Sequence, residues 1–471
     1  MRLGLKALAI ILILVGCSTV GPASERGLIE ADILILDGMI VPVTSEPFAG
    51  SMAIIDGRIM EIGSTESLTG RYSAKQTIVA KGSAVLPGFV NAHTHAPMTL
   101  FRGIADDRPL MEWLTGTIFP AEAANVDRDF VRLGTRLAAA EMIRSGTTTF
   151  ADMYYFESDI AEETKKAGLR AVLGETVIDF PAPDNKSWDD ALRYVRQFAS
   201  RWKNDELITP AIAPHAPYTV SEQHLRQVRA LATELGIPIL IHLAETRDEI
   251  SQIADKYGKT PVGLLSDIGF LGPDVVGAHA IHLDDEDIRL LRASRTGVVH
   301  CPESNMMLAS GVARIPDLLG AGVSVGLGTD GPAGSNNNLD MIEEMASAAR
   351  LQKIHRMDPA VIEAKTVLEM ATIGGARALG LSDRIGSLEA GKRADVIIID
   401  LERAGNQPIY SVESAIVYSA NGADVATTIV DGKLLMHERR LLTLDEKEII
   451  EKARAIRDEV TASLRKSAAG R

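Results

Sequence analysis

Cysteine is nearly absent from this sequence, which has only Cys17 and Cys301 in 471 residues. A framework of several disulfides is therefore excluded, whatever the compartment. The chain also has no internal repeat of roughly 20 to 50 residues and no low-complexity tract, which argues against a repeat architecture. Positive charge is in deficit, with a formal net charge of -14. Such an acidic chain is a poor match for nucleic acid or an anionic membrane surface as its main partner.

The remaining composition is that of an ordinary globular enzyme. Hydrophobic residues make up 46% of the chain and charged residues 24%, both close to the average for folded domains. The length allows a large catalytic domain and a smaller companion. We therefore expect a small molecule as the substrate, and we leave a homo-oligomer open.

The first 21 residues, "MRLGLKALAIILILVGCSTVG", have the pattern of a targeting segment. A basic start precedes an apolar run over 7–15 that is too short to span a bilayer and suits a signal peptide. "LVGC" resembles the bacterial lipobox, in which the cysteine becomes the lipidated first residue. This predicts a signal peptide over 1–16, lipidation of Cys17 and a tether over 17–30. A plain secretory signal or a misassigned start codon is the alternative.

The lipobox also predicts a location. The protein is expected in the bacterial cell envelope, attached to membrane only through the lipid on Cys17. Ser18 after the cysteine favours the outer membrane, facing the periplasm, if the host is Gram-negative.

Both ends of the remaining chain have the texture of β-hairpins. Residues 31–87 contain short apolar stretches broken by glycine, and the same texture returns over 386–442. "IIDGRI" and "IVDGKL" read as one type of hairpin used twice. We predict a small β-sandwich domain built from 31–87 and 386–442, with a terminal helix within 443–471 where apolar residues follow helical spacing.

Between these ends, eight apolar strand-like runs alternate with amphipathic helical stretches over 88–385. Eight such units in about 300 residues predict an α/β fold of the (β/α)8 type. Active sites in that fold lie at the carboxyl ends of the strands. The eight runs are "AVLPGFVNAHTH", "GTTTFADMY", "RAVLGETVID", "ITPAIAPHAPYT", "PILIHLAET", "VVGAHAIHL", "GVVHCPESN" and "VSVGLGTDGP".

Histidines gather at the carboxyl ends of these runs. Seven of the ten histidines in the chain lie there. Histidines with unrelated structural roles would not be concentrated at these positions. A catalytic metal site needs three or four nitrogen or oxygen ligands and an open position. We expect three histidines and one rim carboxylate to supply them, namely His93, His95, His242 and Asp330.

A single divalent metal is the expected cofactor. Dinuclear sites of this type use a lysine on the fourth strand, and "ITPAIAPHAPYT" has none. Zinc suits the nitrogen-rich ligand set best, and ferrous iron suits it nearly as well.

The motifs together resemble the amidohydrolase superfamily, in its mononuclear deaminase branch. The similarity is closest to the 5-methylthioadenosine/S-adenosylhomocysteine deaminases and extends from the first hairpins to "GSLEAGKRADVIIID". It implies a barrel with a split β-domain. The motifs that carry it are "PGFVNAHTHAPMTLFRGIADD", "MEWL", "APHAPYT", "HLAET", "GAHAIHL", "HCPESN" and "GTDGPAGSNN".

The resemblance also implies roles for individual residues. The four expected metal ligands match those of the family. Glu245 matches the acid that carries a proton to the ring nitrogen beside the attacked carbon. His279 matches the residue that holds and polarises the attacking hydroxide, and Asp330 acts in catalysis as well as in metal binding. Substrate contacts, besides Glu245 and Asp330, are expected from Trp113, Glu122 and His215.

Glu175 departs from the family pattern. Family members that bind the homocysteine carboxylate have an arginine near the end of the third strand, where this sequence has Glu175. A glutamate at the pocket mouth would repel a carboxylate tail. It would then act as a substrate contact that disfavours S-adenosylhomocysteine, unless it pairs with an arginine such as Arg102.

The sequence therefore predicts a metal-dependent hydrolytic deaminase of an aminopurine nucleoside, such as 5'-methylthioadenosine, S-adenosylhomocysteine or adenosine. The alternative is a hydrolase or deaminase of another heterocycle, such as a triazine, a pterin or a guanine-like base. A binding lipoprotein with a degenerate barrel would show a broken set of ligands, whereas every metal and acid position is intact. His282, His300 and Cys301 are left without an assigned role.

Overall fold

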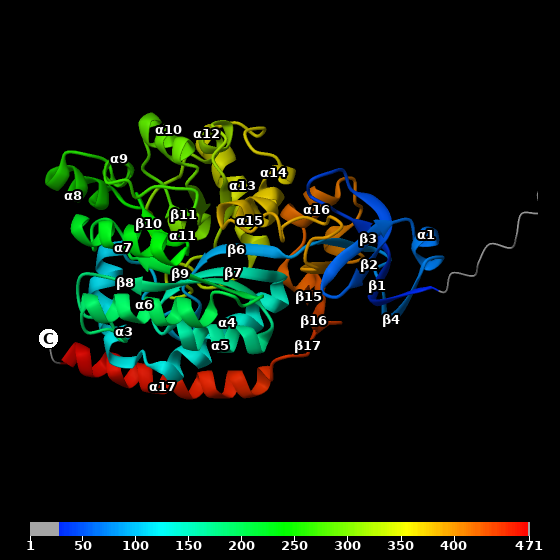
Figure 1. Cartoon of the computed structure of the whole chain (residues 1–471), viewed down its shortest axis with the longest axis horizontal. Coiled ribbons are helices and arrows are strands. Elements are labelled where there is room, and N and C mark those ends of the chain that lie inside the picture. Colours follow the sequence, from blue (N-terminus) through cyan, green and yellow to red (C-terminus); the bar gives the residue numbers. More distant parts are fainter. Residues whose placement is uncertain (1–27, 470–471) are drawn as a thin grey trace, which may run out of the picture.

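The computed structural model describes residues 28–469. The predicted signal peptide and Cys17 lie outside the described residues. A large barrel stands beside a smaller sheet domain, and a long carboxyl-terminal helix runs along the barrel (Figure 1). Within 28–469, no helix is long and apolar enough to cross a membrane.

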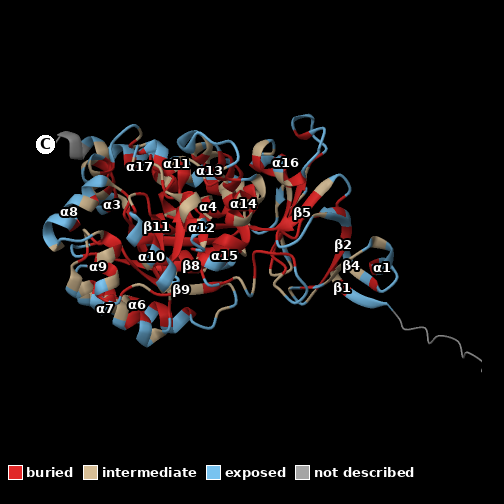
Figure 2. Cartoon of the chain, turned by 90° about the horizontal axis from the view of Figure 1, so that it is seen from above, coloured by how far each residue is buried: buried red, intermediate tan, exposed pale blue. Residues whose placement is uncertain are grey.

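Eight parallel strands close the barrel, in agreement with the predicted (β/α)8 fold. The strands are buried along their length, except for the half-buried Thr209 of β9 (Figure 2). Side chains fill the barrel interior on one face of the strands and pack under helices on the other. The strands are β6 (Phe89–Thr94), β7 (Thr147–Tyr154), β8 (Arg170–Val177), β9 (Ile208–Pro214), β10 (Ile239–Leu243), β11 (Val275–His279), β12 (Gly297–His300) and β13 (Val325–Leu327).

Helices follow the barrel strands, and some of them, such as α4, begin at a side-chain cap. The side chain of Asp127 accepts a hydrogen bond from the first turn of α4, and Gly146 ends that helix in the left-handed region. The helices of the barrel are α2 (Leu110–Trp113), α3 (Phe119–Asn125), α4 (Arg128–Ser145), α5 (Glu157–Ala167), α6 (Trp188–Trp202), α7 (Glu222–Leu235), α8 (Arg247–Tyr257), α9 (Pro261–Asp267), α10 (Asp285–Ser294), α11 (Pro302–Met307), α12 (Ile315–Gly320), α13 (Met341–Arg356), α14 (Ala364–Glu369) and α15 (Gly375–Ala378).

The smaller domain is built from both chain ends, as predicted. A β-sandwich was expected, and the nine strands form one connected sheet. The two ends meet where β14 runs antiparallel to β5. Helix α1 (Thr65–Thr69) packs against β2 and β3 of the sheet, whereas α16 (Val412–Tyr418) packs against α13 and α14. The strands of the sheet are β1 (Ile29–Ile40), β2 (Phe48–Ile55), β3 (Arg58–Gly63), β4 (Tyr72–Val79), β5 (Ser83–Pro87), β14 (Val396–Asp400), β15 (Val425–Val430), β16 (Lys433–His437) and β17 (Arg440–Leu441).

The two Asp-Gly hairpins pack against each other. Both residues of each turn have positive φ, as two-residue hairpin turns of this kind require. A side-chain carbon on Gly432 would lie 2.7 Å from the Cα of Gly57. Glycine is therefore needed for the contact between the turns as well as for the turns themselves.

The terminal helix α17 (Glu446–Ala469) lies along the barrel, in agreement with the expected helix near the carboxyl end. Arg136 on α4 contacts Glu448 at 3.1 Å, and Asn125 donates a hydrogen bond to Ser463 at 2.9 Å. These contacts tie the helix to the segment that follows the first barrel strand.

A buried ion pair joins the barrel to the sheet domain. Arg170 begins β8 and is 2% exposed. Its guanidinium donates to both oxygens of Asp395, at 2.8 and 3.1 Å, and to the carbonyl of Glu206 at 2.6 Å. Asp395, which directly precedes β14, also accepts the backbone N–H of Asp431, which directly follows β15. One carboxylate therefore connects the start of β8 in the barrel to two strands of the sheet domain.

Arg170→Leu is expected to lower the free energy of unfolding by about 3–5 kcal/mol, because Asp395 would be left as an unpaired buried charge. Denaturant unfolding measures this effect. Arg201→Leu is the matched control, since Arg201 is exposed and pairs with Glu162 at the surface, where a pair contributes about 0–1 kcal/mol. Equal losses in the two variants would contradict the account.

Candidate active site

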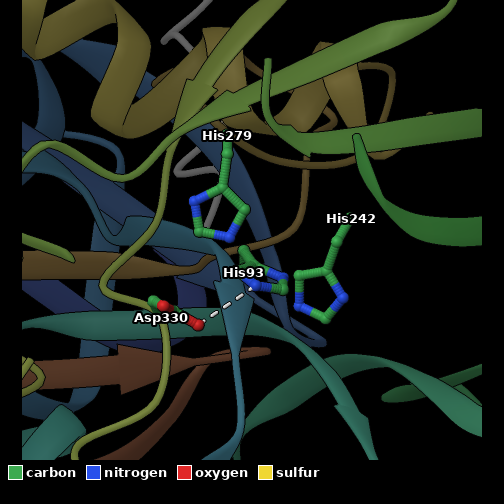
Figure 3. Close-up of side chains that lie close together, drawn as sticks. All are labelled: His93, His242, His279 and Asp330. Atoms are coloured by element: carbon green, nitrogen blue, oxygen red, sulfur yellow. Dashed lines mark ion pairs between the residues drawn. The ribbon is translucent and has the colours of Figure 1, made fainter. Parts of the chain in front are cut away.

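Four buried side chains converge at the carboxyl ends of β6, β11, β10 and the segment after β13. Ligand atoms of His93, His242, His279 and Asp330 all lie within 4.8 Å of one another (Figure 3). His95 joins them, with its Nε2 at 3.2 Å from Asp330 Oδ1 and 3.2 Å from His242 Nε2. The four predicted ligands are thus together, and His279 lies among them.

The hydrogen bonds around the ring nitrogens suit a bound cation. His95 Nδ1 lies 2.5 Å from the carbonyl of Met153, and His242 Nδ1 lies 2.8 Å from that of His215. Each Nδ1 therefore carries the proton, and the two Nε2 lone pairs face each other. His93 Nε2 makes no hydrogen bond within the described part of the chain. Lone pairs that converge in this way repel unless a cation lies between them, so the set fits a divalent metal.

Polar partners hold the ligand side chains in place. Asp330 Oδ2 accepts a hydrogen bond from the hydroxyl of Ser304 at 2.7 Å, which leaves Oδ1 toward the histidines. His279 Nδ1 lies 3.1 Å from Asn305 Oδ1. Such outer contacts orient metal ligands and fix their tautomers.

A pocket opens above this cluster. Glu245 lines it, and its Oε2 lies 4.0 Å from His279 Nε2. Burial raises the pKa of the Glu245 carboxyl above its usual value, against the opposing effect of His279. The raised pKa favours the neutral form of the carboxyl group, which can donate a proton.

Most of the pocket wall is apolar or aromatic. Among the described residues that line it, none is lysine or arginine. The wall residues that sequence reasoning did not identify are Met98, Leu110, Leu114, Ile118, Phe119, Met153, Tyr154, Tyr155, Thr176 and Tyr218.

Three predicted substrate contacts line the same pocket. The Trp113 indole N–H donates to the carbonyl of Ala333 at 2.8 Å, so that its ring remains for the pocket. Burial raises the pKa of Glu122 to about 7, although Tyr154 and His95 act in the opposite direction. Burial lowers the pKa of His215 to about 3, so its imidazole is neutral at physiological pH.

Glu175 lies elsewhere, and its expected position at the mouth is wrong. Successive strand residues face opposite sides, and Thr176 is the residue of this strand end that lines the pocket. Glu175 is fully buried, where it accepts hydrogen bonds from Glu157 N and Asn185 Nδ2, both at 3.1 Å. Burial and the nearby Asp184 raise its pKa well above the usual value. Arg102 pairs with Glu141 instead.

Glu175→Ala is expected to lower the free energy of unfolding by about 2 kcal/mol or more, because two buried donors lose their acceptor. Thermal or denaturant unfolding measures the loss. Glu222→Ala is the control, because Glu222 begins α7 at the surface and, in the described part of the chain, pairs only with Arg226 of the same helix. If stability held and the preference between charged and neutral substrates shifted instead, Glu175 would belong to the pocket after all.

The remaining rim residues are outside the pocket wall. His282 Nε2 lies 2.8 Å from the carbonyl of Ser310. His300 is fully buried, and neither of its ring nitrogens has a hydrogen-bond partner in residues 28–469. Cys301 is also buried, and burial raises the pKa of its thiol well above the usual value, which makes it a poor nucleophile.

Sequence reasoning also missed the residues that support the ligands. Asp152 accepts hydrogen bonds from Thr94 Oγ1 and Ala96 N, both at 2.6 Å, and so fixes the turn that carries His95. Ser304 and Asn305 belong to the quoted motif "HCPESN". Their position directly after a barrel strand was the signal that could have identified them.

A barrel with a nitrogen-rich metal site at the carboxyl ends of its strands defines a class of metal-dependent hydrolases, and the comparisons identify the family. Residues 84–435 match the amidohydrolase family. The chain belongs to this family and is an enzyme of the amidohydrolase type.

Individual relatives are similar over most of their length. A 5-methylthioadenosine/S-adenosylhomocysteine deaminase of Syntrophobacter fumaroxidans is 48% identical over 91% of this chain and 98% of its own. A 5'-deoxyadenosine deaminase of Methanosarcina mazei is 45% identical over 92% and 99%. The crystal structure of an adenosine deaminase from Xanthomonas campestris with bound zinc has a TM-score of 0.91 and 39% identity, covering 93% of this chain and all of that one.

These relatives contradict the predicted localisation. Both curated relatives are named for the deamination of a nucleoside, and neither is named as a lipoprotein or envelope protein. The prediction of a lipid-anchored enzyme in the cell envelope is therefore wrong, and membrane attachment has no support. It depended on a short apolar run and a four-residue motif, both of which lie outside the residues that the structure describes.

Proposed function

We propose that this enzyme removes the 6-amino group of an aminopurine nucleoside by hydrolysis and releases ammonia. The observation that carries the proposal is the buried Glu245 carboxyl beside His279, directly above the converged histidines and Asp330. A pocket with this apolar and aromatic wall suits a flat heteroaromatic ring. The names of the relatives support the same class of substrate.

One divalent metal, zinc or ferrous iron, would be held by His93, His95, His242 and Asp330. A bound metal of this kind lowers the pKa of water and so supplies a nucleophile at neutral pH. The facing Nε2 atoms of His95 and His242 support this ligand set. The Nδ1 of His279 lies on Asn305, so its Nε2, which lies 4.0 Å from Glu245 Oε2, is left to hold the attacking oxygen.

Glu245 is proposed to move the proton. Its neutral carboxyl would donate to the ring nitrogen beside the amino-bearing carbon, which makes that carbon more electrophilic. The resulting carboxylate would take a proton from the water that adds to this carbon and pass it to the amino nitrogen, which leaves as ammonia when the carbon–nitrogen bond breaks. The remaining hydroxyl proton would return to Glu245, which leaves the 6-oxo product and the neutral carboxyl group. Burial supports this role because it favours the neutral form of Glu245.

The remaining pocket residues would set the orientation of the nucleoside. Trp113 offers an aromatic face, and Glu122 can accept hydrogen bonds from ribose hydroxyls. His215 is held by Thr219 through Nδ1 at 2.9 Å and has its Nε2 free for substrate. These assignments place the base above the metal ligands and the sugar toward Trp113 and Glu122.

The pocket should favour neutral 5' substituents. No lysine or arginine among the described residues lines it, and Glu122 does. A carboxylate tail would lose water without gaining a counter-ion. We expect kcat/KM for 5'-methylthioadenosine or adenosine to exceed that for S-adenosylhomocysteine by about tenfold, which corresponds to roughly 1.4 kcal/mol.

Ammonia release over a panel of aminopurine nucleosides, pterins, guanine and aminotriazines tests the proposal, with halide release from chlorotriazines measured in parallel. The proposal expects the nucleosides to be the best substrates. A higher kcat/KM on a free base or a triazine would contradict the proposal. If S-adenosylhomocysteine were the best nucleoside, only the expected preference for neutral 5' substituents would be contradicted.

A further inference from the structure

Glu249 makes an unusual contact four residues after Glu245. Thr246 caps α8 through a hydrogen bond from Glu249 N to its hydroxyl at 3.2 Å. In an ordinary capping box the glutamate at the third helical position would return the bond to the backbone N–H of the cap, Thr246. Here its two oxygens reach further back, to Ala244 N and Glu245 N, each at 2.9 Å.

The backbone that Glu249 holds is strained. Ala244 has φ 50, in the left-handed region that a residue with a side chain rarely occupies. Such a conformation costs free energy and persists only where its surroundings impose it. The Ala244 carbonyl in turn accepts the backbone N–H of Ile281 and of His282, in the turn after β11. Both backbone polar groups of Ala244 are therefore hydrogen-bonded, its N–H to Glu249 and its carbonyl to that turn.

The strained turn decides where Glu245 points. It lies between Leu243, the last residue of β10, and Arg247, the first residue of α8. The Glu245 carboxyl reaches to within 4.0 Å of His279 Nε2. Glu249 itself does not line the pocket and is 1% exposed. Burying a carboxyl group is unfavourable unless it is hydrogen-bonded, and both of its bonds go to this turn.

We propose that Glu249 is a positioning residue that sets the geometry of Glu245 for proton transfer. It does not touch substrate or metal, and it acts only through the turn 244–245. This inference rests on the proposed role of Glu245. The expected signature is a loss of kcat with little change in KM, because only the transition-state geometry is affected.

A double-mutant cycle tests the inference. In Glu249→Gln the side-chain amide has only one acceptor oxygen, and its NH2 group would face one of the two backbone N–H groups. One of the two hydrogen bonds to the turn would therefore be lost. We expect kcat to fall about 10- to 100-fold, with KM within about threefold and metal content unchanged. The double variant Glu245→Gln/Glu249→Gln should be no slower than Glu245→Gln alone, since a residue that acts through Glu245 has nothing left to position.

Asp287→Asn is the matched control. Asp287 is also 1% exposed and accepts the backbone N–H of Asp284, which is the ordinary capping box of α10, and it does not line the pocket. It should lose stability and keep kcat. If Glu249→Gln does not fold, Glu249→Asp, whose carboxyl is one methylene short, replaces it in the same cycle.

Two results would overturn the inference. One is near-normal kcat in the Glu249 variant while Glu245→Gln is impaired. The other is additive losses in the double variant, which would indicate a general structural role. Near-normal turnover in Glu245→Gln would instead show that the proposed proton carrier is wrong, so the two failures are distinguishable.

Discussion

Glu245→Gln is expected to lose about 100-fold or more of kcat while it keeps its metal. The amide is nearly isosteric with the carboxyl group but cannot donate and take back a proton, and general acid–base groups typically contribute 10²- to 10⁴-fold. Steady-state ammonia release gives kcat, and elemental analysis of the same preparation gives the metal content.

Glu303→Gln is the control for this substitution. Glu303 follows β12 near the same rim, does not line the pocket, and burial raises the pKa of its carboxyl to about 7. It should keep near-normal turnover. If Glu245→Gln were as active as Glu303→Gln, the proton-transfer role would belong to another group.

Removal of the metal is expected to abolish turnover and to lower stability. His95 Nε2 lies 3.2 Å from His242 Nε2 and 3.2 Å from Asp330 Oδ1, and His93 Nε2 lies 3.3 Å from the same oxygen. Without a cation these groups repel or must take up protons, so metal binding stabilises the folded state. Treatment with a chelator, followed by activity assays and thermal unfolding, measures both effects.

Titration of the metal-free protein then counts the ions. Activity and thermal stability should return together and saturate at one equivalent of zinc or ferrous iron per chain. A requirement for two equivalents would contradict the single-metal site predicted from the absence of lysine on β9. Full activity of the metal-free protein would contradict the metal site altogether.

The parts of the fold that the sequence predicted are those encoded locally. Each barrel strand is a short apolar run with turn or helix signals at both ends, and each Asp-Gly hairpin is specified by two adjacent residues. The metal site followed from the same patterns, because strands of one barrel place their carboxyl ends together. His93 and Asp330 could therefore be paired across 237 residues of sequence before their distance of 3.3 Å was known.

The parts that could not be predicted depend on side-chain direction and on pairs distant in sequence. Glu175 and Thr176 are neighbours at a strand end, and only the direction of alternation decides which one lines the pocket. No local pattern connects Arg170 with Asp395. Glu249 fits the capping-box pattern, but its carboxyl passes the cap and binds the turn before it.

The most direct test of the central claim is a product analysis with purified, metal-loaded enzyme and 5'-methylthioadenosine. The account predicts the 6-oxo nucleoside with its glycosidic and thioether bonds intact and one ammonia released for each nucleoside consumed. Release of free adenine, or consumption of the nucleoside without ammonia, would contradict hydrolytic deamination as the reaction of this enzyme.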